Sequence, residues 1–151
     1  ADKIMKRLRF DNKTTNKVLR LIKHHDRRIE PNQKSVRKAV SIIGKDIFPD
    51  LLKVQEADKK GQNPQYLDER LKVLDEIKDI FFNLEKEGQI LNLKDLALNG
   101  NDLLAMGFEQ SREIGIILRE LYNIVLDNPE MNTKEKLTEI VENIRKKSFK
   151  T

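Results

Sequence analysis

Residues 22–31, IKHHDRRIEP, bring together side chains that can do chemistry: His24, His25, Asp26, Arg27 and Arg28 follow one another directly. Histidine and aspartate are common ligands of catalytic metals, whereas arginine binds phosphate through its planar guanidinium group. Polar residues of this kind also suit the C-terminal end of a helix, where cations complement the partial negative charge of the last carbonyl groups. The segment is therefore compatible with a metal site, a phosphate-binding patch or a helix end.

A metal site is the least favoured of these interpretations. Neighbouring residues on a helix point about 100° apart, so His24 and His25 cannot both face one ion. Helical ligand pairs lie four residues apart, as in H-E-x-x-H, and the chain has no such pair. The chain contains only these two histidines and no cysteine. We therefore expect no metal site in this chain.

A phosphate-binding patch agrees with the distribution of charge. Residues 1–45 hold 14 Lys and Arg against 4 Asp and Glu, whereas residues 46–151 hold 16 against 21. A cationic excess confined to one part of a chain favours a polyanionic partner, with chance clustering on a solvated surface as the alternative. The predicted binding cations in this part are Lys23, Arg27, Arg28, Lys34, Arg37 and Lys38.

A second candidate lies between two predicted helices further along the chain. Gly107 predicts a tight turn, and Ser111 can cap the helix that follows, whose free N–H groups would receive a phosphate. Gly115 would let an RNA backbone approach that helix closely. The predicted RNA-binding residues of this part are Gly107, Ser111, Arg112, Gly115 and Arg119, and the two arginines would add positive charge.

Two observations weaken the second candidate. The same residues fit a helical hairpin in which Gly107 ends the first helix and Gly115 is a helix-packing contact. Residues 101–131 also hold two Arg against six Asp and Glu, which argues against strong electrostatic binding of RNA by this part of the chain. The cations at the C-terminal end are better electrostatic candidates, namely Arg145, Lys146, Lys147 and Lys150.

Helices must position both candidates, because helix-capping residues recur along the chain and strand-like alternation is nearly absent. The expected N-caps are Asp11 or Asn12, Asn32, Asn63, Ser111 and Asn132, the last in a capping box with Glu135. The glycines expected to end helices are Gly44, Gly61 and Gly88. Apolar residues recur at three- and four-residue steps between residues 67 and 84, with Phe81 expected in the core. We predict an all-α fold of seven to nine helices.

Composition limits the class of protein. A chain of 151 residues suits one domain or two small ones. It lacks cysteine, a signal peptide and any run near the roughly 20 apolar residues of a membrane span, so we expect a soluble cytoplasmic protein without a membrane partner. Six Phe, two Tyr and no Trp are too few for single-strand recognition by base stacking. Recognition of folded RNA by shape and phosphate contact fits better.

Three segments resemble parts of one family, the class II tRNA nucleotidyltransferases, which include bacterial CCA-adding enzymes and poly(A) polymerases. Residues 8–29, LRFDNKTTNKVLRLIKHHDRRI, resemble the end of the family's HD-like helical region, and residues 36–66 are similar to the body helices that follow. Residues 93–137 resemble its tail, with an NGxDLxxxG element, a later glycine and an I-L-x-x-L helix. Relatives tend to carry Gly-Pro before the isoleucine where this chain has EQSREIG, and this departure argues against contact by the loop.

The resemblance implies a multi-helix body over residues 1–88, including the end of the HD-like region, and a smaller helical tail over residues 89–151. The stretch after Gly88 is rich in small and amide residues and is compatible with a short extended piece. The family's metal-binding aspartates lie in an N-terminal head and its nucleotide-selecting residues in a neck. We therefore expect a C-terminal fragment that is inactive alone, with no catalytic residue and no cofactor, while Mg²⁺ and nucleoside triphosphates bind the absent head.

The leading functional hypothesis is a noncatalytic fragment whose body and tail hold tRNA, away from the 3′ end where nucleotides are added. The second hypothesis is a helical protein-interaction domain whose basic face meets an acidic partner. The third and weakest is a metal-dependent HD phosphohydrolase, for which His25 and Asp26 would supply ligands. A homo-oligomer is compatible with the sequence, and so is either CCA or poly(A) synthesis by the parent enzyme.

Overall fold

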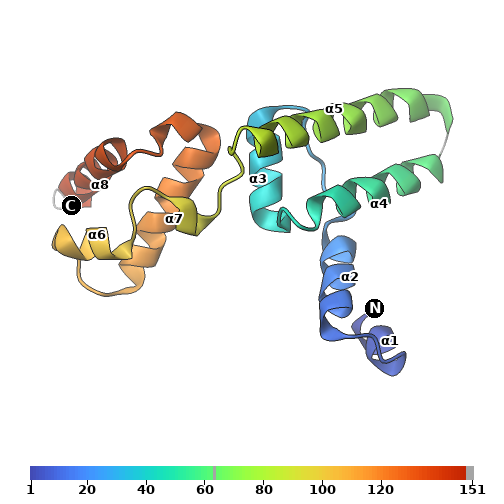
Figure 1. Cartoon of the computed structure of the whole chain (residues 1–151), viewed down its shortest axis with the longest axis horizontal. Coiled ribbons are helices and arrows are strands. Elements are labelled where there is room, and N and C mark those ends of the chain that lie inside the picture. The colour runs from blue at the N-terminus through green and yellow to red at the C-terminus, as the bar shows by residue number, and fades with distance from the viewer. Residues whose placement is uncertain (63, 149–151) are drawn as a thin grey trace. The chain divides into compact units, whose positions relative to one another are not determined.

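The computed structural model describes residues 1–62 and 64–148, and over them helices are the only regular elements (Figure 1). Eight α-helices within this part of the chain confirm the predicted all-α fold. The predicted cap Asn63 and the predicted cation Lys150 lie outside the described residues. None of the described helices is both long enough and apolar enough to cross a membrane.

The chain divides into two compact units, Ala1–Ile90, here called the body, and Leu91–Thr151, here called the tail. The body contains α1 (Asp2–Arg7), α2 (Asn12–His24), α3 (Gln33–Ile43), α4 (Phe48–Lys60) and α5 (Leu67–Lys86). The tail contains α6 (Gly100–Ala105), α7 (Arg112–Asp127) and α8 (Lys134–Ser148). The expectation that residues 1–88 and 89–151 fold as separate domains stays a prediction.

The body is built around α5, which packs against α3 and α4, while α2 packs against α1 and α4 (Figure 1). Its apolar core includes Phe48 and Phe81, whose ring centroids are 5.0 Å apart. The expected burial of Phe81 is confirmed, since only 2% of its surface is exposed. The core thus holds α3 and the segment before it on a rigid support.

Most predicted caps are confirmed by their hydrogen bonds. Asp11 accepts from the backbone N–H of Thr14 at the start of α2, and Asn32 accepts from that of Ser35 at the start of α3. Gly44 ends α3 with a φ of 98°, a conformation that favours glycine. The helix α5 begins at Leu67, because Pro64–Tyr66 form a short 3₁₀ turn before it.

The tail has a core of its own, which joins α6, α7 and α8. Its fully buried members include Leu103 on α6, Leu121 on α7 and Leu137 on α8. The NGxDL element is the start of α6: the Asn99 side chain accepts from the N–H groups of residues 101 and 102, and the Asp102 carboxylate accepts from the Asn99 N–H at 2.9 Å. This motif therefore has a structural role.

The described residues after Gly88 form no strand; they contain a 3₁₀ turn, Leu93–Asp95, followed by α6, and Asn92 before that turn has an extended backbone. One expectation for the tail is wrong. Asn132 does not cap α8, because its side chain accepts from the Ala97 N–H at 2.8 Å and donates to the Asp95 carbonyl at 3.0 Å. Hydrogen bonds to residues 95 and 97, which are distant in sequence, thus replace the expected capping box with Glu135.

Candidate nucleic-acid interface

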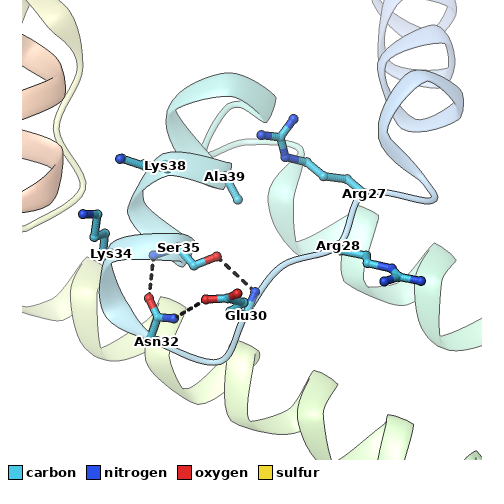
Figure 2. A pocket seen from close by; sticks show the side chains of 8 residues that line it. All are labelled: Arg27, Arg28, Glu30, Asn32, Lys34, Ser35, Lys38 and Ala39. Atoms are coloured by element: carbon cyan, nitrogen blue, oxygen red, sulfur yellow. Dashed lines mark hydrogen bonds between the residues drawn. The ribbon is translucent and has the colours of Figure 1, made fainter. Parts of the chain in front are cut away.

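An open hollow of about 480 Å³ lies on the body, between the segment that follows α2 and the first turns of α3 (Figure 2). We call it the body hollow; the cations that line it are Arg27, Arg28, Lys34 and Lys38. Glu30 is the only carboxylate among its lining residues, so the lining is strongly positive. Four of the six cations predicted for this part of the chain are therefore brought together by the fold.

Three hydrogen bonds fix the shape of the body hollow, as Figure 2 shows. The Glu30 N–H donates to the Ser35 hydroxyl at 3.0 Å. The Ser35 N–H donates to Oδ1 of the Asn32 side chain at 2.8 Å. The Asn32 side-chain amide also donates to the Glu30 carboxylate at 3.0 Å. These bonds tie residues 30–32 to the first turn of α3, so the loop backbone after Arg28 is held against the helix that carries Lys34 and Lys38.

The backbone that carries the two arginines is supported from the core side. The side-chain amide of Gln55, on α4, donates to the Arg27 carbonyl at 2.9 Å. Gln55 is buried, so this bond is shielded from competing water. Arg27 and Arg28 also line a neighbouring hollow beside α4 and α5, which places them on the ridge between two concave surfaces.

Arg37 and Lys23 do not join this cluster. Arg37 is 6% exposed. Its guanidinium donates to the side-chain oxygen of Gln89, a residue just after the end of α5, at 3.3 Å. Its predicted role as an accessible binding cation is therefore wrong: it borders the buried stripe of α3 and links that helix to the end of α5. Lys23 is exposed on the last turn of α2 but does not line the body hollow.

The two histidines behave as parts of a helix end. His24 is buried, and this burial lowers its pKa, with further lowering from the positive charges of Lys23 and Arg27. His25 is exposed, and its Nδ1 lies 2.7 Å from the Ile22 carbonyl, to which it donates. Among the described residues, no three His, Cys, Asp or Glu side chains are grouped so that they could hold a metal ion. The residues present thus do not fit a metal centre.

Three of the five residues predicted for the tail share one exposed face of α7. Arg112, Gly115 and Arg119 are spaced by three and four residues, which places them on the same side of the helix. All three are exposed, and Ser111 caps the helix by accepting from the Glu113 N–H at 3.2 Å. Ile116 lies on this face too, although it was not predicted; its spacing from Arg112 and Arg119 is the signal that could have identified it. We call these four α7 residues the α7 face.

The two glycines of this region have different roles. Gly107 has a φ of 88° and forms the turn after α6, where Arg145 donates to the Met106 carbonyl at 2.9 Å. The Arg145 guanidinium also lies 5.6 Å from the centre of the Phe108 ring, so this predicted C-terminal cation holds the turn. A Cβ atom at Gly115 would meet no atom within 4 Å. The alternative in which Gly115 is a helix-packing contact is therefore wrong.

The carboxylate in the first turn of α6, that of Asp102, is bound by other residues of the tail. Lys134 donates to Asp102 at 2.7 Å, and this bond, followed by the Asn99 N–H, lowers the pKa of Asp102. Asp102 thus stays ionised at neutral pH and completes the cap of α6. Its charge is paired with that of Lys134.

Comparison with known proteins gives one match. The family model described as tRNA nucleotidyltransferase domain 2 matches residues 1–141, which is most of the chain. Neither a search of curated proteins nor a search of solved structures found a match.

Proposed function

The chain belongs to the tRNA nucleotidyltransferase family, and from this premise we propose that it is a tRNA-binding part of such an enzyme that takes no part in the chemistry. The observation that carries the proposal is the body hollow, which is lined by four cations from a loop and from α3. Arginine and lysine bind the phosphates of RNA with little regard to sequence and fix the position of the RNA on the protein. Nucleotide addition, with its Mg²⁺ and nucleoside triphosphate, is assigned to a separate head region.

The geometry suits folded RNA. The body hollow is open and concave, and its cations come from a loop and from one side of a helix (Figure 2). A helical RNA segment presents phosphates along a curved ridge, which such a surface can follow by shape. The α7 face would make a second contact, with two guanidinium groups and the capped helix N-terminus.

A salt titration of tRNA binding tests the proposal. We expect log K to fall linearly with log salt, with a slope of about −3 from four phosphate contacts and a steeper one if the α7 face contributes. Binding should be measured by filter retention for intact tRNA and for tRNA that lacks its three terminal nucleotides. Both should bind equally, because the contacts lie on the body of the tRNA. Weak, salt-independent retention equal to that of a neutral polymer would contradict the proposal.

A second candidate, a protein-interaction domain, is favoured by one observation. An apolar hollow of about 370 Å³ is lined by Val18, Leu21, Ile22, His25 and Val54, from α2, its end and α4. Apolar surface of this kind is typical of protein contacts. Indifference to tRNA, together with a stable dimer in light scattering, would favour this function over tRNA binding.

Gly115 provides a test in which stability and binding change in opposite directions. Gly115→Ala is expected to raise the free energy of unfolding by about 0.5–1 kcal/mol, because glycine disfavours a helix interior and the added Cβ meets no neighbour. It should weaken tRNA binding, because the methyl group occupies space that the RNA backbone would use. Chemical denaturation and a binding titration of the same variant measure the two effects.

Asn143→Ala is the matched control for Gly115→Ala, since it removes a poor helix former from an exposed position of α8. It should stabilise the tail without changing tRNA binding. If Gly115→Ala stabilises the protein and leaves binding unchanged, the α7 face does not contact RNA.

A further inference from the structure

A second hollow of about 480 Å³ lies on the body, between the segment that follows α2 and the helices α4 and α5. We call it the α4–α5 hollow. Its volume falls within the range of roughly 300–1,000 Å³ that is typical of small-ligand sites. The contacts proposed for tRNA involve neither its apolar lining nor the side chains that α4 contributes to it.

One part of the lining of the α4–α5 hollow is apolar. Leu74 and Ile77 of α5 belong to this part and are almost fully buried in the body core, and Val73 beside them is 38% exposed. Ile29, from the segment after α2, adds to the same lining. A flat ring that covered these aliphatic side chains would remove apolar surface from water, which favours binding.

Charged side chains without a partner form another part of the lining. Figure 2 shows that Arg28 extends away from Lys34 and Lys38 of the body hollow. Lys59, on α4, is half-buried in the lining of the α4–α5 hollow. Within the part of the chain that the structure describes, the side chains of Arg28, Lys59 and Asp26 form no ion pair and no hydrogen bond. Because a half-buried ammonium group is stabilised by an anion, the hollow offers two cations to an anionic ligand.

A third part of the lining is a carboxylate that accepts hydrogen bonds. The Gln62 side-chain amide donates to Asp58 at 2.8 Å, and Arg70 of α5 donates to the side-chain oxygen of Gln62 at 3.0 Å. These bonds join the end of α4 to the start of α5 and hold the Asp58 carboxylate at the hollow. An ionised carboxylate has several acceptor positions, so Asp58 can also accept from the amino group of a ring or from a hydroxyl group.

We propose that the α4–α5 hollow binds a free nucleoside monophosphate. The base covers Val73 and Leu74, Arg28 and Lys59 hold the phosphate, and Asp58 accepts hydrogen bonds from the base or the ribose. A sugar phosphate without a base would leave the apolar lining exposed to water, and a lipid chain would offer no donor to the carboxylate. The inference goes beyond tRNA binding and does not depend on it, because it needs neither lysine of the body hollow.

A titration of the ¹⁵N-labelled chain with AMP, followed by NMR, tests the inference. We expect a dissociation constant on the order of 0.1–1 mM, because the hollow is open and covers only part of the ligand. The amide signals of Asp58, Lys59 and Val73 should shift, and those of the tail should not. Ribose 5-phosphate, adenosine and inorganic phosphate should each bind at least tenfold more weakly than AMP, since each lacks one of the groups that the hollow recognises.

Two substitutions should weaken AMP binding by about tenfold each. Lys59→Gln removes a charge-assisted contact with the phosphate, and Val73→Glu places a carboxylate on the apolar lining. The matched controls are Lys60→Gln and Val54→Glu, because neither residue lines the hollow and Val54, at 36%, is about as exposed as Val73. Both controls should bind AMP as the unsubstituted chain does.

Three results would overturn the inference. Inorganic phosphate that binds as tightly as AMP would indicate a simple anion site, and signal shifts confined to Lys34 and Lys38 would place the nucleotide in the body hollow. Equal losses in the substituted and control chains would show that binding is not specific to the α4–α5 hollow. No RNA is present in this experiment, so its failure leaves the proposed tRNA binding to be decided by the salt titration, and the two failures are distinguished.

Discussion

Replacement of all four cations of the body hollow by glutamine is expected to weaken tRNA binding by roughly 10²–10³-fold at about 0.15 M salt. Each cation that neutralises a phosphate releases condensed counterions, so the loss of four contacts removes about 3 from the slope of log K against log salt. The side chains line an open surface, so we expect the fold to survive the changes. Filter binding at several salt concentrations measures both the affinity and the slope.

The matched control carries the same change in charge on other exposed surface of the body, with glutamine at Lys53, Lys60, Lys72 and Lys86. These lysines lie on α4 and α5 and do not line the body hollow. The control should lose only a small part of the affinity, through the general field of the protein. Equal losses in the two variants would mean that net charge, and not the body hollow, determines binding.

Phe81→Ala is expected to lower the free energy of unfolding of the body by about 3–5 kcal/mol, because it removes a buried ring and leaves a cavity. Phe81 is 2% exposed and contacts Phe48, in the core that joins α3, α4 and α5. The tail core is made of other residues, around Leu121. Amide hydrogen exchange should therefore show lost protection in the body helices and unchanged protection in α7.

The adjacent residue supplies the control for Phe81→Ala. Phe82 has 57% of its surface exposed, so Phe82→Ala should reduce stability by far less, even though its ring lies 5.6 Å from that of Phe81. If Phe81→Ala removes protection from α7 as well as from the body, the two units unfold together. That result would contradict the prediction of separate domains.

The sequence indicates the helices and most of their ends, because these depend on contacts between near neighbours. Asp11, Asn32 and Ser111 cap helices through bonds to residues two or three positions away, so the pattern alone predicts them. Asn132 shows the limit of this approach. Its side chain is bound by residues 95–97, more than 30 positions earlier, and the local cap is lost to that tertiary contact.

The candidate interface divides in the same way. Sequence alone determined that cations are concentrated around residues 23–38 and that helices carry them, because charge and helical periodicity can be read along the chain. Only the tertiary structure decided that Lys34 and Lys38 line the body hollow while Arg37 is buried and bonded to Gln89, just after α5. It also decided which isoleucine of α7 reaches solvent, since burial depends on the packing of helices that are distant in sequence.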